Sequence, residues 1–356
     1  MPAPPISGLD LTPPLAAAVV LACIAVALYA LRAHQRRQQR SERRRVGEFM
    51  RRCEGFLRGQ NSAAALRDTL DHTSEGEFWT ALERLSMHWS RAEWRALSAA
   101  LERNSFTNDE RRALRHDSPW RQVLAARRLT LLRSKANRRA LRRGLVRGDE
   151  MGAFACAQAL ARYRDIAALR WLLEHPGRIE RRAPLAQVAL LGGFGRHGRG
   201  VLASALERGV EAPCVERALI EVLGTLGERT AQSAIQRRLS SPSFELRVVA
   251  ARALGRLRAT DAAAALLAAL QDEAWQVRAQ AARALGEAGV QSAVLALPAK
   301  LSDPAWWVRR HAAYALAELG PAGHAALREI LEHSPDRYSR DMAGEVLDGG
   351  PKLGAA

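Results

Sequence analysis

The sequence from Ser241 to Asp336 contains one unit that occurs three times. Its most regular part reads RVVAARALG at 247–255, RAQAARALG at 278–286 and RRHAAYALA at 309–317. The marker leucines of the units lie 31 residues apart, at Leu254, Leu285 and Leu316. A fixed period of this size is typical of a solenoid, in which each unit buries its apolar side by stacking on the next. The repeat therefore predicts an elongated stack of similar units.

Each unit is expected to form two helices. The first helix begins where Ser or Asp can accept hydrogen bonds from free amides and where Pro fits the first turn, at Ser241-Pro242, Asp272 and Asp303-Pro304. It ends near a glycine, which adopts the left-handed conformation of a helix end without strain, at Gly255, Gly286 and Gly320. The second helices are expected over 262–270, 291–301 and 322–331. Strand-like alternation is absent from the sequence, so we predict an all-α fold.

The units resemble HEAT repeats, in particular the short HEAT-like repeats first named for the phycobilisome lyases. The shared pattern is an Asp-Pro start, a Val-Arg pair, paired alanines and then Ala-Leu-Gly. Val277-Arg278 and Val308-Arg309 match the Val-Arg pair, and Leu246-Arg247 differs by one conservative change. The resemblance implies a right-handed α-solenoid with the second helices on the concave side. It also implies a structural ladder in which each arginine bonds to the aspartate of the preceding linker, with the members Arg247, Arg278, Arg309, Asp272 and Asp303.

The period extends in both directions from the clear repeats. Leucines recur at steps of 31 or 32 residues, at Leu223, Leu191, Leu160, Leu129 and, after Leu316, Leu347. We therefore expect about eight helix pairs over 118–349, followed by a tail at 350–356. Residues 61–117 lack the consensus, and we interpret them as a divergent helical cap because the end of a solenoid must cover its apolar side. Trp79, Trp89 and Trp94 are expected in the core of this cap.

Residues Leu15 to Leu31 form an uncharged apolar run of seventeen residues, which predicts a transmembrane helix after a short tail at 1–14. The flank from Arg32 to Arg52 carries nine arginines and two glutamates, and we expect a basic juxtamembrane helix over 32–60. By the positive-inside rule, the protein is predicted in the bacterial inner membrane, with its N-terminus outside and its body in the cytoplasm. The run and its flank are thus expected to contact the membrane.

No motif predicts a catalytic, cofactor-binding or metal site. The GxGxxG pattern at 193–198 follows a predicted helix, whereas a dinucleotide site needs a strand before it. The family includes deoxyhypusine hydroxylase, whose iron ligands are His-Glu pairs, but this chain has only the reversed order, at Glu174-His175 and Glu332-His333. The four cysteines are far apart and form no CxxC pair, so neither disulfides nor zinc are expected.

The net charge of +17 is concentrated in two blocks, the flank above and residues 111–148, which contain thirteen basic residues and one acidic residue. A helix expected over 134–147 carries a candidate binding patch of six residues, Lys135, Arg138, Arg139, Arg142, Arg143 and Arg147. The patch is either a solvated charged face or a site for an acidic protein segment or anionic head groups.

The chain is therefore expected to be a membrane-anchored scaffold or adaptor that binds a protein partner. Two alternatives remain open. One is a HEAT-type enzyme resembling the lyases or the hydroxylase. The other is a nucleic-acid-binding solenoid, which the predicted membrane anchor disfavours.

Overall fold

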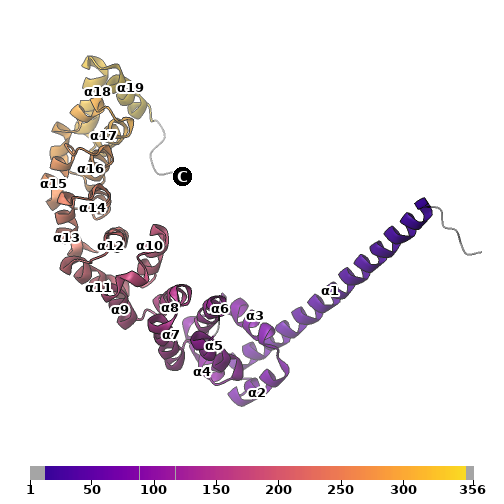
Figure 1. Cartoon of the computed structure of the whole chain (residues 1–356). Coiled ribbons are helices and arrows are strands. Elements are labelled where there is room, and N and C mark those ends of the chain that lie inside the picture. Colours follow the sequence, from indigo (N-terminus) through magenta and orange to yellow (C-terminus); the bar gives the residue numbers. More distant parts are fainter. Residues whose placement is uncertain (1–12, 88, 117, 350–356) are drawn as a thin grey trace, which may run out of the picture. The chain divides into compact units, whose positions relative to one another are not determined.

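The computed structural model of the protein describes residues 13–87, 89–116 and 118–349 (Figure 1). The predicted tails at 1–14 and 350–356 lie outside the described residues, apart from Pro13 and Pro14, which begin the first helix. Every regular element in the described part is a helix. The chain divides into two compact units, unit 1 with Met1–Glu110 and Leu131–Ser134, and unit 2 with Arg111–Thr130 and Lys135–Ala356.

Unit 1 is built from α1 (Pro13–Leu57), α2 (Ala63–Asp68), η1 (Thr69–His72), α3 (Glu75–Leu85), α4 (Arg91–Leu101) and the first part of α5 (Ser105–His116). Its core surrounds Phe78, whose ring lies 5.8 Å from that of Phe49, 4.8 Å from that of Trp79 and 5.2 Å from that of Phe106. Trp89 and Trp94 pack against this core. The three tryptophans therefore pack in or against the core of unit 1.

Helix α1 does not support the predicted membrane span. Within the described residues, no helix has an apolar stretch long enough to cross a membrane. The part from Leu21 to Leu31 covers about 16 Å at 1.5 Å per residue, about half of the hydrocarbon thickness of a bilayer. The side chains of residues 13–20 and of Cys23 lie outside the description. This finding contradicts the span predicted from Leu15 to Leu31 and the inner-membrane location inferred from it.

Unit 2 contains helix pairs that follow one another along the chain. The described pairs are α6 (Pro119–Leu129) with α7 (Lys135–Arg147), α8 (Glu150–Arg162) with α9 (Ile166–Glu174), α10 (Pro184–Gly192) with α11 (Gly195–Arg208), α12 (Pro213–Leu226) with α13 (Gln232–Arg237), α14 (Phe244–Arg256) with α15 (Ala263–Ala269), α16 (Trp275–Ala288) with the 3-10 segments η6 (Gln291–Leu295) and η7 (Pro298–Ser302), and α17 (Trp306–Glu318) with α18 (Pro321–His333). Helix α19 (Arg337–Leu347) follows the last pair. Shorter 3-10 turns lie in the linkers as η2 (Pro176–Arg178), η3 (Arg229–Ala231), η4 (Arg238–Ser240) and η5 (Thr260–Ala262).

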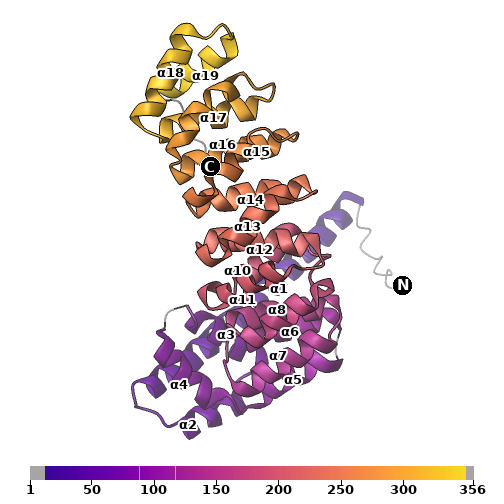
Figure 2. The ribbon, with the colours of Figure 1, turned by 90° about the vertical axis from the view of Figure 1, so that its left-hand side faces the viewer.

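The pairs of unit 2 stack into a curved double row, as expected for a solenoid. In Figure 1 the first helices α12, α14, α16 and α17 form the inner row, and α11, α13 and α15 form the outer row. Figure 2 shows the same stack from its outer side. The expectation that second helices line the concave side is therefore wrong for this chain.

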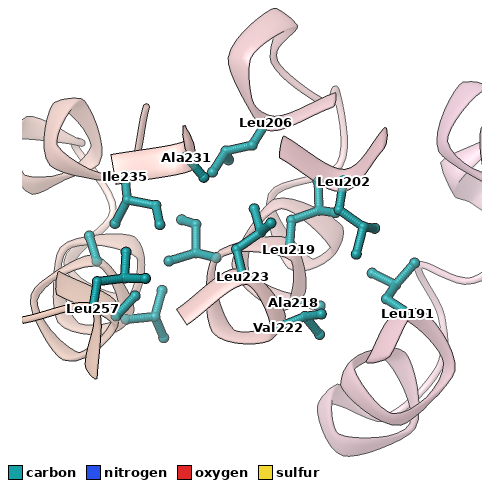
Figure 3. Close-up of a cluster of buried hydrophobic side chains, with 14 of the residues drawn as sticks. Leu191, Leu202, Leu206, Ala218, Leu219, Val222, Leu223, Ala231, Ile235 and Leu257 are labelled. Carbon is teal, nitrogen blue, oxygen red and sulfur yellow. The ribbon is translucent and has the colours of Figure 1, made fainter. Parts of the chain in front are cut away.

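The marker leucines form the centre of this stack. All seven, from Leu129 to Leu316, are completely buried. Figure 3 shows Leu191, Leu219 and Leu223 of the inner row facing Leu202, Leu206 and Ile235 of the outer row. Each pair thus buries its apolar side against its own partner helix and against the next pair.

The glycines of the Ala-Leu-Gly motif serve close packing rather than helix termination. A Cβ on Gly255 would meet Ala284 Cα at 2.9 Å, and one on Gly286 would meet Ala315 Cα at 2.7 Å. The left-handed positions lie three residues later, at Arg258 with φ 50° and Gly289 with φ 71°. These glycines therefore allow neighbouring inner helices to approach closely.

The second element of the α16 pair differs from the continuous helix expected at 291–301. It consists of the two 3-10 segments η6 and η7, which are separated by Ala296 and Leu297, and Pro298 begins η7. Proline has no N–H to donate and crowds the preceding turn, so a regular helix does not pass through this position.

Candidate protein-binding face

Arg247 and Arg278 each bind the aspartate of the following linker. Arg247 donates from Nε to Asp272 Oδ2 at 2.7 Å and from Nη2 to Oδ1 at 2.9 Å. Arg278 makes the same two bonds with Asp303, at 2.8 and 2.9 Å. Nη1 of each arginine also donates to two carbonyl oxygens of its own preceding linker. Each arginine thereby connects two successive linkers.

The direction of this pairing is the reverse of the one implied by the family resemblance. The preceding linker offers carbonyl oxygens to the arginine, and the carboxylate comes from the next unit. Arg309 consequently has no carboxylate partner among the described residues. It donates to Asp303 O at 2.8 Å and to Pro304 O at 3.1 Å, and its guanidinium lies 5.2 Å from the ring centroid of Tyr338.

The two complete pairs are ionised in the folded protein. Burial by itself would raise the pKa of Asp303, but hydrogen bonds from Arg278 and from the N–H of Ala305 hold that pKa below the ordinary aspartate value. The hydrogen bond to Asp303 in turn raises the pKa of Arg278. In the other pair, the pKa of Asp272 is likewise lowered and the pKa of Arg247 is raised. The structure thus gives these residues a role in joining successive units.

The six residues of the predicted basic patch all lie on α7 with exposed side chains. Two of them are used in an internal contact. Arg142 binds Asp165 through Nε at 2.9 Å and Nη2 at 2.7 Å, and Arg138 Nε lies 3.7 Å from the same carboxylate. Asp165 is fully buried and also accepts from the N–H of Ala168 at the start of α9. Within the described residues, the four patch members without an ion pair are Lys135, Arg139, Arg143 and Arg147.

Two of the four remaining patch members lie beside a small cavity. Arg143 and Arg147, together with Arg115, line a cavity of about 220 Å³ at the start of α8. Asp149 at its rim accepts from the N–H of Gly152 and caps α8. The patch is therefore a narrower basic surface than the sequence alone suggested.

A row of exposed aromatic side chains crosses the inner helices, and the sequence reasoning missed it. Phe244, Trp275 and Trp306 begin α14, α16 and α17 and are 39%, 40% and 42% exposed. They are separated by 31 residues, the period of the repeat. We call this set the aromatic row. A comparison of the three units position by position would have found it.

A second row of side chains lies two helical turns further along the same helices. Arg252 and Arg283 occupy this position on α14 and α16, and Tyr314 occupies it on α17. Arg252 Nη1 lies 3.6 Å from Glu221 Oε1, and Arg283 Nε lies 2.7 Å from Glu287 Oε1. We call Arg252 and Arg283 the arginine row. Residues eight apart on a helix share one face, so both rows look out from the same side.

The surroundings of Arg252 are strongly positive. Burial lowers the pKa of Arg252, and repulsion from Arg256, Arg283 and Arg217 lowers it further, while Glu221 acts in the opposite direction. Arg283 of this row lines an open cavity of about 880 Å³ with Arg256 and Arg258, and Glu287 and Glu318 also line it. The face thus carries more arginines than carboxylates, and Glu221 and Glu287 pair with the two arginines of the row.

On α17 one side chain, that of Arg310, lies between Trp306 and Tyr314. The guanidinium of Arg310 lies 5.1 Å from the ring centroids of both Trp306 and Tyr314, in contact with both rings. It also forms an ion pair with Glu345 of α19. On this helix, therefore, a guanidinium lies between two aromatic rings.

His311 on α17 is expected to make stability depend on mildly acidic pH. Burial, with Arg283 and Arg310 nearby, lowers its pKa to about 4. An unfolded histidine titrates near pH 6.5, so the unfolded chain binds a proton over this window that the folded chain does not. Stability should therefore fall as the pH drops from about 6.5 to 4. Urea denaturation midpoints measured across this range should show a smaller decline in His311→Gln, and an unchanged decline would contradict the assignment.

The GxGxxG pattern and the Glu-His pairs lie at helix ends and in a turn between helices. Gly193 and Phe194 form the turn between α10 and α11, and residues 195–198 are the first turn of α11, with Gly195 at φ 59°. A helix, α10, precedes the pattern. His175 stacks on Trp171 at the end of α9, and His333 ends α18. Within the described residues, no group of three or more His, Cys, Asp or Glu side chains is placed to hold a metal ion.

Comparison with known proteins identifies the repeat type. The family model described as HEAT repeats matches residues 201–276 and 263–348. No curated protein matches the sequence significantly.

Several solved structures align over much of the chain with low scores. Human deoxyhypusine hydroxylase in complex with glycerol has 19% identity, covers 68% of this chain and 94% of its own, and gives a TM-score of 0.29. The CpcE–CpcF complex of phycocyanin lyase from a Nostoc species has 22% identity, coverages of 58% and 74%, and a TM-score of 0.34. The Escherichia coli protein YibA has 16% identity, coverages of 70% and 94%, and a TM-score of 0.44. No activity is transferred to this chain from these likenesses.

Proposed function

We propose that the protein, whose residues 201–348 match the HEAT-repeat model, is a scaffold that binds a partner polypeptide on the inner face of unit 2. The binding face comprises the aromatic row and the arginine row of α14, α16 and α17.

The observation that carries this proposal is the repetition of exposed side chains with the period of the fold. Buried positions repeat because the core requires them, but exposed positions are free to vary. Large aromatic side chains recur nevertheless at Phe244, Trp275 and Trp306, each about two-fifths exposed. Tryptophan and arginine are the residues most enriched among the side chains that dominate protein interfaces. Rows of both types on one face favour contact with another protein.

The basic patch on α7 is proposed as a second contact surface for an acidic segment of the partner. Its support is the set of exposed cations on one helix and the cavity lined by Arg143 and Arg147. Arginine suits such a contact because its planar guanidinium binds a carboxylate through two parallel hydrogen bonds.

Affinity capture with matched variants tests which face binds. The full-length protein is expressed with a tag in its own cells, and the captured proteins are quantified by mass spectrometry. Arg252→Gln with Arg283→Gln should reduce the recovery of the specific partner at least about tenfold. Arg139→Gln with Arg143→Gln removes the same charge from α7, where a weaker loss is expected because this surface is secondary.

The outcomes separate the candidate surfaces and functions. Equal recovery with wild type and the inner-face variant would refute the proposed face, and loss in the α7 variant alone would move the main site to α7. The same preparation tests the two alternatives. A stoichiometric metal or cofactor would instead support a HEAT-type enzyme, and salt-dependent retention of duplex DNA would support a nucleic-acid-binding solenoid.

A further inference from the structure

Within the described residues, the four members of the basic patch that make no ion pair form a row along α7. Lys135, Arg139, Arg143 and Arg147 follow one another at steps of four residues, and all four side chains are exposed. At 3.6 residues per turn, each step changes the direction of the side chain by about 40°. The row therefore turns gradually along one side of the helix over about 18 Å, at 1.5 Å per residue, and it ends at Arg147, the last residue of α7.

The cavity of about 220 Å³ lies at this end of the row. Arg143 and Arg147 line it from α7, Arg115 lines it from α5, and Asp149 lines it from the start of α8. All of these residues belong to unit 2. Within the part of the chain that the structure describes, the three arginines make no ion pair, and the carboxylate of Asp149 accepts from the N–H of Gly152 at 2.6 Å. The charged side chains around the cavity therefore carry a net charge of +2.

Neighbouring helices hold the walls of this cavity in place. Arg178 of the following unit donates from Nη1 to Gly148 O at 3.0 Å and from Nη2 to Val146 O at 2.6 Å. Gln122 of α6 lines the cavity and lies directly against the first turn of α8, where a Cβ on Gly152 would overlap its Oε1. The space between the arginines thus exists before a ligand enters, which lowers the ordering cost of binding.

The volume of the cavity restricts the ligand to a small group. Sites for cofactors and drug-sized molecules enclose about 300–1,000 Å³, which is more than the 220 Å³ available here. The cavity has room for about seven water molecules at about 30 Å³ each. A phosphate group, with one phosphorus and four oxygen atoms, fits into this space, whereas a whole nucleotide does not.

The charge of the cavity favours a phosphate group over a carboxylate. A phosphate monoester carries a charge of about −1.5 to −2 at pH 7 and offers three acceptor oxygens, which matches the net charge of +2 and the three guanidinium groups. A single carboxylate would leave about half of the positive charge without a counterpart. Arginine is also the cation best suited to phosphate, because its planar guanidinium donates two parallel hydrogen bonds.

We propose that this cavity binds the phosphate group of a phosphorylated serine or threonine in the partner polypeptide. Acidic residues of the same segment contact Arg139 and Lys135, which lie beyond the cavity in the row. A free phosphate ion would use the cavity alone, whereas a segment of about six extended residues spans the 18 Å of the row. This proposal rests on the proposed protein-binding function and specifies the ligand of the surface on α7.

Synthetic peptides test the proposal on the full chain. The probe is a fluorescent peptide with one phosphoserine between two runs of three glutamates, and its binding is measured by fluorescence anisotropy. Two control peptides carry serine or glutamate in place of the phosphoserine. The phosphopeptide should bind with a Kd at least about tenfold below those of both controls.

Matched variants locate the binding site. Arg143→Gln and Arg147→Gln should each raise the Kd of the phosphopeptide about tenfold, since a hydrogen bond to a charged group contributes about 1.5–3 kcal/mol. Both should change the Kd of the serine peptide much less. Arg328→Gln removes an exposed arginine from α18 and should leave every Kd unchanged. Circular dichroism should show the same folding for all three variants, because exposed charges contribute little to stability.

Two further probes distinguish other sources of a phosphate group. Inorganic phosphate should displace the phosphopeptide only at concentrations at least about tenfold above the Kd of the peptide; displacement at the Kd itself would make the free ion the ligand and contradict the proposal. Vesicles of phosphatidylcholine with phosphatidic acid should bind wild type and Arg147→Gln equally. Vesicle binding that is lost in Arg147→Gln, with no preference for the phosphopeptide, would assign the cavity to a lipid head group instead.

Two results would overturn the phosphate site directly. One is equal binding of the phosphoserine and serine peptides, and the other is an unchanged Kd in both Arg143→Gln and Arg147→Gln. If the phosphopeptide fails while the inner-face variant still loses its native partner in the capture experiment, the protein-binding function stands and only the phosphate site is wrong. Full recovery of the partner in both capture variants would instead count against the proposed binding surfaces themselves.

Discussion

Arg278→Ala is expected to lower the free energy of unfolding by about 3–5 kcal/mol, because it leaves a buried carboxylate without its cation. The side chain of Asp303 is only 5% exposed and receives two hydrogen bonds from Arg278. The substitution also removes donors to the carbonyl oxygens of Asp272 and Glu273. Urea denaturation of the full chain, followed by circular dichroism, measures the loss.

Arg309→Ala is the matched control for this substitution. Arg309 occupies the same position in the next unit but donates only to carbonyl oxygens, at 2.8 and 3.1 Å. Arg309→Ala should lower the free energy of unfolding by about 1 kcal/mol, because it removes only ordinary hydrogen bonds. Equal losses in the two variants would show that the carboxylate pairing with Asp303 contributes nothing.

The dependence of stability on pH below about 4 gives an independent check of the Arg278–Asp303 pair. The pKa of Asp303 is held below its ordinary value, so the pair contributes stability above the unfolded value of about 3.9. That contribution is lost as the pH falls through the lower, folded value. The decline in stability below about pH 4 should therefore be shallower in Arg278→Ala than in wild type.

Gly286→Ala is expected to destabilise the stack by about 1–3 kcal/mol through overpacking. The added Cβ would lie 2.7 Å from Ala315 Cα, and a backbone atom cannot move aside without shifting α17. Alanine favours a helix over glycine by about 1 kcal/mol, so a measured loss would be net of this gain. Thermal unfolding of the full chain would show it as a lower Tm.

Gly200→Ala provides the control for the glycine prediction. Gly200 lies inside α11, and a Cβ there would meet no atom within 4 Å. The substitution should therefore leave stability unchanged or raise it by up to about 1 kcal/mol. A Gly286→Ala variant as stable as Gly200→Ala would mean that neighbouring inner helices can separate without cost.

The sequence predicted the helical repeat well because the period and the buried leucines report directly on the core. The sequence identified Arg278 as a member of the ladder, but the resemblance indicated Asp272, in the preceding linker, as its partner. In the structure the guanidinium of Arg278 instead binds Asp303, in the following linker. The α7 helix was predicted over 134–147 and lies at Lys135–Arg147. Its contact with Asp165 was not predictable, because it depends on how two successive units are packed.

The candidate site was hidden for a different reason. The consensus that identifies the repeat consists of core positions. It therefore gives no information about exposed positions such as Trp275. The period nevertheless contained the signal, because the aromatic row keeps the spacing of the leucines. At the N-terminus the sequence pattern predicted too much. The apolar run from Leu15 to Leu31 predicted a membrane span that the described helix does not support.

The interruption at Pro298 makes the stack mechanically uneven. Arginine–aspartate pairs join the linkers of successive units around α14 and α16, whereas the outer element of the α16 pair is two short 3-10 segments. Such segments have poorer hydrogen-bond geometry than an α-helix, and they open locally at lower free energy. Bending of the superhelix will therefore concentrate at this unit, whose inner helix carries Trp275 and Arg283.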